Sequence, residues 1–149
     1  MLFMKETTCE CHKTVAFMLL RLFLAMLFIV AFLGKLKGEG NDYALANLVG
    51  FSKGLVEQFA QATFLPRILL IPFCWALPWL EVIFGVALLL GIKTRCMLMC
   101  LGFLMLALCF GMMLMKQHDT VAKNAFYLFL IVTALYLLPH NRCCLVKDK

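Results

Sequence analysis

Charged residues are scarce in this sequence. They make up 15% of the 149 residues, whereas hydrophobic residues make up 64% and the mean hydropathy is +0.96. A soluble domain of this size could not bury so much apolar surface. The composition therefore excludes a soluble globular protein and leaves too little polar sequence for a second domain. It predicts an integral membrane protein in which residues 1–149 form a single membrane domain.

The sequence also lacks the motifs that hold the common redox cofactors. No haem, flavin or iron–sulfur signature is present, so a redox role would place the cofactor on a partner protein. The net charge of +6 lies mostly in short loops and termini, which is typical of residues that flank a membrane. We therefore expect the lipid bilayer, and not nucleic acid, to be a partner.

Four apolar stretches are long enough to cross a bilayer, and turns containing glycine, lysine or proline separate them. They cover about residues 15–33, 68–91, 96–115 and 122–138. The predicted fold class is therefore all-α: a polytopic membrane four-helix bundle. With four spans, both termini and the turn at residues 91–95 lie on the same side of the membrane.

The long connection between the first two spans has its own pattern. Over about residues 44–61, apolar side chains fall on one helical face and polar side chains fall elsewhere. This pattern predicts an amphipathic interfacial helix in the first loop. We expect it to cover the end of the bundle as a structural lid, with gating of a cavity as the alternative. The apolar face contains Leu45, Leu48, Val49, Leu55, Val56 and Phe59.

Basic residues give the expected orientation. The side that carries the termini has seven lysines and arginines and the other side has six, which favours cytoplasmic termini. The first group is Lys5, Lys13, Lys93, Arg95, Arg142, Lys147 and Lys149, and the second is Lys35, Lys37, Lys53, Arg67, Lys116 and Lys123.

Glu81 lies in the middle of the second apolar span, where an ionisable residue costs roughly 2.5–3.5 kcal/mol. Arg21 in the first span is its expected partner. At 1.5 Å per residue, Arg21 lies about 10 Å and Glu81 about 15 Å from the same surface. The two residues predict a buried polar site. It is either a structural ion pair that fixes helix register, or a site for a quinone head group, a proton or an anionic substrate.

Lys35 and Asn124 are additional candidates for this site, at the opposite membrane surface. Lys35 closes the first span and Asn124 opens the fourth. Each also has a structural explanation, because lysines at span ends extend to the interface and asparagine is a common N-cap residue.

The eight cysteines divide into two groups. Four lie within spans, where cysteine most often packs as a small apolar residue; Cys96 and Cys100 are one turn apart and share a face. We expect the methionines of residues 97–115 to be packing or lipid-facing residues too. The terminal group could bind a soft metal of the zinc or copper(I) type, with reduced or acylated cysteines as the alternative. Its candidate ligands are Cys9, Cys11, His12, Cys143 and Cys144.

Cysteine is absent from both loops that would face outward. Four-helix membrane thiol oxidases need cysteine pairs on the oxidising side, near a quinone. The predicted orientation therefore argues against this class, which returns only if the topology is inverted.

Several segments together resemble the DoxX family of small four-span bacterial membrane proteins, over about residues 13–138. The most distinctive is the run Glu-x-x-x-Gly that begins at Glu81 and continues to Gly-Ile-Lys-Thr-Arg at residues 91–95. The others are Arg21-Leu22, Gly34-Lys35-Leu36, Leu65-Pro66, Pro78-Trp79-Leu80, the stretch of residues 54–59, and Asn124. The cysteine-rich tails depart from the family's pattern.

The resemblance implies a multi-pass protein of the bacterial inner (cytoplasmic) membrane. The family is named for a small membrane subunit of an archaeal thiosulfate:quinone oxidoreductase, and relatives are linked to membrane redox complexes and thiol handling. It implies a membrane subunit or anchor of a quinone-linked or thiol redox complex, with quinone as the candidate cofactor. Candidate partners are a soluble or peripheral redox subunit and a second copy of the chain. The alternatives are a small transporter or proton relay that uses Glu81, and a non-catalytic scaffold.

Overall fold

The structure, a computed structural model, describes residues 2–37, 42–64 and 66–140, and within these ranges it describes the side chains of residues 12–139. Helices account for most of these residues. They are α1 (Leu2–Leu36), α2 (Leu45–Ala62), α3 (Arg67–Leu90), α4 (Thr94–Leu114), α5 (His118–Leu137) and a short 3-10 helix, η1 (Leu138–His140).

Four segments of these helices are long and apolar enough to cross a membrane: His12–Leu36, Arg67–Leu90, Thr94–Leu114 and His118–Leu137. The predicted all-α, polytopic architecture is therefore confirmed. The first span is longer than expected at both ends. The fourth begins at His118, several residues before the expected start, so that Asn124 lies inside the helix.

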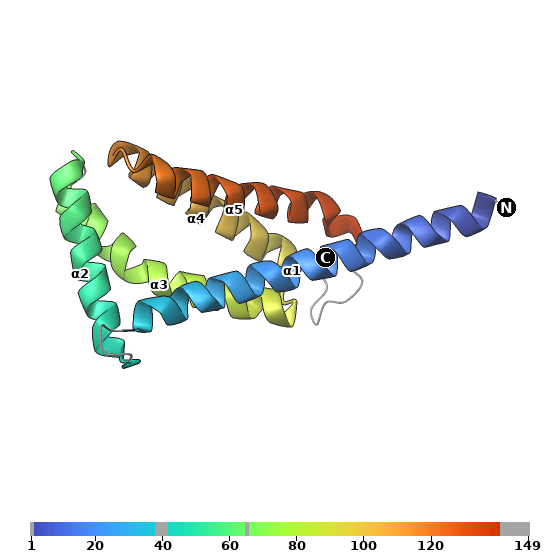
Figure 1. Cartoon of the computed structure of the whole chain (residues 1–149), viewed down its shortest axis with the longest axis horizontal. Coiled ribbons are helices and arrows are strands. Elements are labelled where there is room, and N and C mark those ends of the chain that lie inside the picture. Colours follow the sequence, from blue (N-terminus) through green and yellow to red (C-terminus); the bar gives the residue numbers. More distant parts are fainter. Residues whose placement is uncertain (1, 38–41, 65, 141–149) are drawn as a thin grey trace.

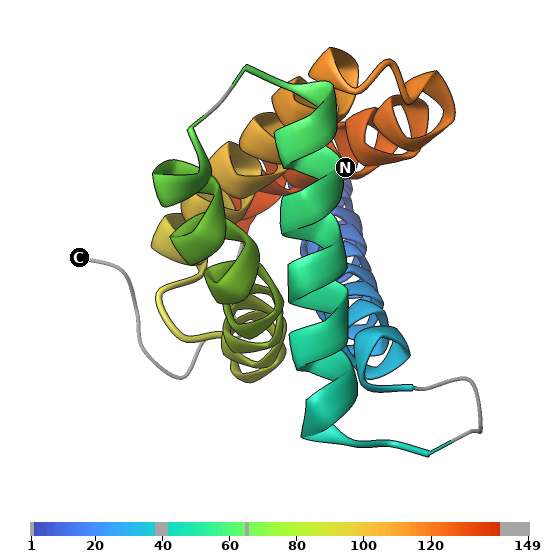
Figure 2. The same cartoon turned by 90° about the vertical axis from the view of Figure 1, so that its left-hand side faces the viewer.

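The amphipathic segment forms α2, which lies across one end of the other helices (Figure 1). In the end-on view it passes in front of the bundle (Figure 2). Its buried residues are Leu48, Ser52, Leu55 and Phe59, which recur every three or four positions along one face. This face packs toward the bundle, as the apolar pattern predicts.

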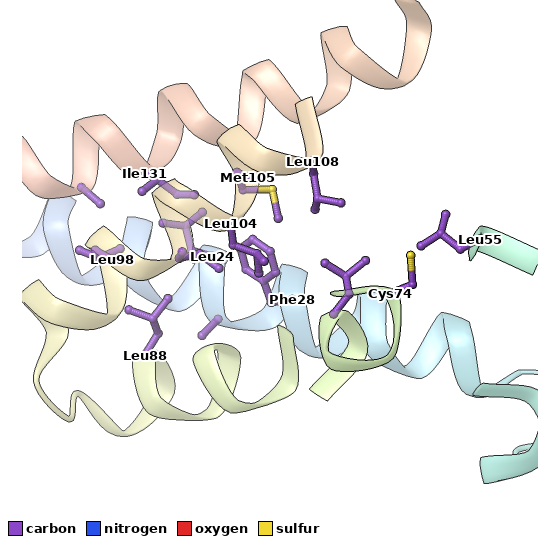
Figure 3. Packing of buried hydrophobic residues seen from close by; sticks show 14 of the residues in the cluster. Leu24, Phe28, Leu55, Cys74, Leu88, Leu98, Leu104, Met105, Leu108 and Ile131 are labelled. Atoms are coloured by element: carbon purple, nitrogen blue, oxygen red, sulfur yellow. The ribbon is translucent and has the colours of Figure 1, made fainter. Parts of the chain in front are cut away.

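The core of the bundle is formed by α1, α3, α4 and α5. It includes Phe17, Leu24 and Phe28 of α1, Leu88 of α3, Leu98, Leu101 and Met105 of α4, and Ile131 of α5, with Leu55 of α2 and Cys74 of α3 at one end (Figure 3). The outward faces of the spans carry large exposed apolar residues, among them Val30, Ile83, Phe103, Phe110 and Phe129. Apolar residues on the outside suit contact with lipid rather than water.

Two glycines allow helices to approach closely. A Cβ added at Gly85 of α3 would lie 3.2 Å from the Ala25 carbonyl oxygen and 3.3 Å from the Ile29 nitrogen of α1. A Cβ at Gly111 of α4 would lie 2.6 Å from the ring of Phe59. The first contact sets the register of α1 against α3, and the second seats the C-terminal half of α2 on the bundle.

Candidate functional site

Glu81 lies on α3 and is buried, with 5% of its surface exposed. The ammonium group of Lys35, near the C-terminal end of α1, donates a hydrogen bond to Glu81 Oε2 and forms an ion pair with it. The exposed fractions of the two side chains are 16% for Lys35 and 6% for Glu81. The cost of burying the carboxylate is therefore offset by an opposite charge in direct contact.

The register of α1 against α3 brings these two residues together. The helices run in opposite directions, and Gly85 lies against Ala25 and Ile29. Nearer the end of α1, the rings of Phe32 and Trp79 pack with 6.1 Å between their centroids. Lys35 follows Phe32 by three residues, one turn closer to the end of α1. Lys35 and Glu81 therefore lie at similar positions along the axes of α1 and α3, so the long lysine side chain can reach the carboxylate.

Helix α2 closes the site from a third direction. The Lys35 Nζ atom lies 5.2 Å from the centroid of the Phe51 ring, within the range of a cation–π interaction. Asn47 fixes the start of α2 to the end of α1, because its side-chain amide donates hydrogen bonds to the carbonyl oxygens of Leu36 and Asp42, both at 2.9 Å. Lys35 is thus held between a carboxylate of α3 and an aromatic ring of α2.

A small pocket of about 130 Å³ lies between α2 and α3, and its lining residues are neighbours in sequence of Glu81 and Phe51 rather than these residues themselves. Trp79 contributes to its wall and precedes Glu81 by two residues, and the buried Ser52 follows Phe51 directly. A cavity of about 150 Å³ is large enough to bind benzene, so the pocket has the size of a single six-membered ring. Its lining residues are Leu45, Leu48, Val49, Ser52, Trp75 and Trp79.

The residue that the structure joins to Glu81 is therefore Lys35, an additional candidate in the sequence, whereas Arg21 was the expected partner. Arg21 is also buried, with 8% exposed, but it lies 14 residues before Lys35 on the same helix. That is about 21 Å at 1.5 Å per residue. The pairing of Arg21 with Glu81 stays a prediction that the register of α1 and α3 does not favour. The depth estimate compared only distances from one membrane surface, and such distances do not determine which residues of α1 and α3 meet.

The structure gives the surroundings of the two additional candidates. Lys35 forms the ion pair with Glu81. Asn124 is not an N-cap, since Gln117 precedes the first residue of α5 and Asn124 lies nearly two turns further on. Asn124 is half-buried and takes no part in the ion pair.

The predicted terminal metal site falls largely outside the described residues. Cys143 and Cys144 lie there, as do the side chains of Cys9 and Cys11, while His12 is exposed. Among the described residues, no group of three histidine, cysteine, aspartate or glutamate side chains could hold a metal ion. Cys74 and Cys109 are buried, as expected for packing residues, but Cys96 and Cys100 are exposed.

Sequence reasoning missed the aromatic part of the site. Trp75, Trp79 and Phe51 were not singled out, although both tryptophans of the chain lie within six residues of Glu81. Ser52 carried a further signal, because it is the polar residue on the otherwise apolar face of α2.

Comparison with known proteins gives one match. Residues 13–124 match a protein family described as methylamine utilisation protein MauE. This range contains α2, α3 and α4 complete, and with them Lys35, Phe51 and Glu81. No curated protein and no solved structure matches the chain. The comparison supports a small multi-pass membrane protein, but it does not show membership of the DoxX family.

Proposed function

The chain belongs to the family of the methylamine utilisation protein MauE, and from this premise we propose that it is a membrane component of a redox pathway that binds a quinone. The quinone ring would occupy the pocket between α2 and α3, next to Lys35 and Glu81. The family's association with a redox pathway and the resemblance to DoxX, whose founding member is a subunit of a quinone oxidoreductase, support this proposal.

The observation that carries the proposal is the buried ion pair beside an aromatic pocket. Buried ionisable groups within a membrane span mark functional sites more often than lipid-facing positions do. Here Lys35 of the pair lies over the Phe51 ring of α2, and a cavity with the volume of one ring, about 130 Å³, lies between α2 and α3. Two tryptophans provide flat apolar walls, which suit a planar ring.

The side chains suit a quinone chemically. The carbonyl oxygens of a quinone accept hydrogen bonds, and the Lys35 ammonium group is a donor with three N–H bonds. Reduction of a quinone takes up two electrons and two protons. In the proposed function the electrons come from a cofactor on a partner protein, and Lys35 and Glu81 orient the ring and exchange protons with it. We further propose that the protein lies in the bacterial inner membrane with cytoplasmic termini.

Intrinsic fluorescence tests the binding step directly, because the only two tryptophans in the chain line the pocket. The full chain in phospholipid nanodiscs would be titrated with decylubiquinone, and we expect saturable quenching. Glu81→Gln breaks the ion pair and should weaken apparent binding about tenfold, equivalent to about 1.4 kcal/mol. Lys35→Met should act in the same direction.

Matched controls are available on α2. Glu57→Gln and Lys53→Met change exposed residues of the same types and should leave the titration unchanged. Quenching that does not saturate, or that is equal in the wild type and the Glu81→Gln variant, would contradict the proposed site.

A structural ion pair is the second candidate, and the direct contact between Lys35 and the buried Glu81 favours it. In that case Lys35 and Glu81 only fix the register of α1 against α3. The Glu81→Gln variant would then lose stability, while quinone would fail to quench the fluorescence of either protein in a saturable way.

A further inference from the structure

A second chemical feature lies beyond the C-terminal end of α3, in the first two turns of α4. Cys96 and Cys100 are exposed there, unlike Cys74 and Cys109, which are buried in the core. Packing within the chain therefore explains the buried cysteines but not these two.

Met99 shares their face of α4. Residues three and four positions apart are neighbours on a helix surface, which groups Cys96 with both Met99 and Cys100. Cys96 and Cys100 lie one turn apart on the same face of α4, so their side chains are neighbours on the helix surface. The Met99 side chain is 40% exposed. Three sulfur atoms are thus presented together on one exposed surface.

We propose that Cys96, Met99 and Cys100 form a binding site for copper(I). Thiolate and thioether sulfur are the ligands that select copper(I), whereas zinc structural sites use four cysteine or histidine ligands. On binding, the two thiols lose their protons to water and both sulfur atoms bond to the metal. The complex then carries one negative charge, and no change of oxidation state occurs.

The surroundings suit an anionic complex. The first turn of α4 provides the partial positive charge of a helix N-terminus, and Lys93 and Arg95 lie next to Cys96 in the sequence. Cys96 is about 3 Å and Cys100 about 9 Å along the axis from the first residue, Thr94, at 1.5 Å per residue. The ligands therefore lie near the end of the candidate span and are exposed, so a metal ion can reach them.

Copper(I) itself is the probe for the test. The purified full chain would be titrated anaerobically against the chromophoric chelator bathocuproine disulfonate. The double variant Cys96→Ser/Cys100→Ser should lose one equivalent of bound copper per chain relative to the wild type. Met99→Leu keeps the shape of the side chain and removes its sulfur, so it should retain that equivalent at lower affinity.

The control is Cys9→Ser/Cys11→Ser, which removes another pair of thiols. This variant should still bind the one equivalent of copper(I) per chain that we assign to Cys96, Met99 and Cys100. Circular dichroism of each variant checks that helix content is unchanged. An unchanged stoichiometry in the Cys96→Ser/Cys100→Ser variant would overturn the proposal. So would equal affinity in the wild type and the Met99→Leu variant, because the thioether would then not be a ligand.

Discussion

Lys35 and Glu81 should be strongly coupled in a double-mutant cycle. The two single substitutions should also differ in how much they destabilise the protein. Lys35→Met leaves the carboxylate of Glu81, whose side chain is 6% exposed, without its cation. Breaking a buried ion pair in this way costs about 3–5 kcal/mol. Glu81→Gln should cost less, about 1–3 kcal/mol. Lys35 is the penultimate residue of α1 and can still extend toward the surface.

The double variant Lys35→Met/Glu81→Gln leaves no buried charge and should be more stable than Lys35→Met alone. The cost of the double variant should therefore fall well below the sum of the single costs. The assay is unfolding of the detergent-solubilised protein by sodium dodecyl sulfate, followed by circular dichroism, for the four proteins of the cycle.

The exposed residues Lys53 and Glu57, one turn apart on α2, form a matched control pair whose coupling should not exceed about 0.5 kcal/mol. Additive costs for Lys35→Met and Glu81→Gln would refute the assigned ion pair. If Glu81→Gln destabilised the protein more than Lys35→Met, the unpaired lysine and not the unpaired carboxylate would be the more costly buried charge, which would contradict this prediction.

Two further predictions concern α2 and the topology. Gly111→Ala should destabilise the protein by about 1–3 kcal/mol, because its Cβ would lie 2.6 Å from the Phe59 ring. Gly102→Ala on the same helix, where the nearest atom is 3.6 Å away, should be neutral or stabilising in the same unfolding assay. In intact cells an impermeant maleimide should label Lys116→Cys but not Lys93→Cys. The reverse pattern would invert the orientation and restore the thiol-oxidase alternative.

The sequence was sufficient to predict the architecture because periodicity and span length reflect the solvent around each helix. The apolar stretches must satisfy their backbone groups as helices within lipid. The helical repeat of apolar residues in 44–61 likewise arises because one face of this helix packs on the bundle. Both signals are local, so they need no knowledge of which helices touch.

The partner of Glu81 depends instead on the register between two helices, which is not a local property. Counting residues from the start of the first span and the end of the second gave Arg21 and Glu81 similar depths, but similar depth does not determine which side chains of two helices meet. Helix α1 continues to Leu36, and Gly85 fixes its contact with α3, so that Lys35 reaches Glu81. Arg21 and Lys35 lie 14 residues apart on the same helix, so the register between α1 and α3 decides which of them meets Glu81. The pocket was missed for a similar reason, since its walls come from two different helices.

Photo-crosslinking with an azido-quinone tests the proposed quinone site most directly. After illumination of the full chain in nanodiscs, mass spectrometry would locate the modified peptides. We expect adducts on residues 45–52 of α2 and 75–81 of α3. They should disappear with excess decylubiquinone and decrease in the Glu81→Gln variant but not in the Glu57→Gln variant. Adducts that lie elsewhere in the chain, or that are unaffected by the competitor, would contradict a quinone site at Lys35 and Glu81.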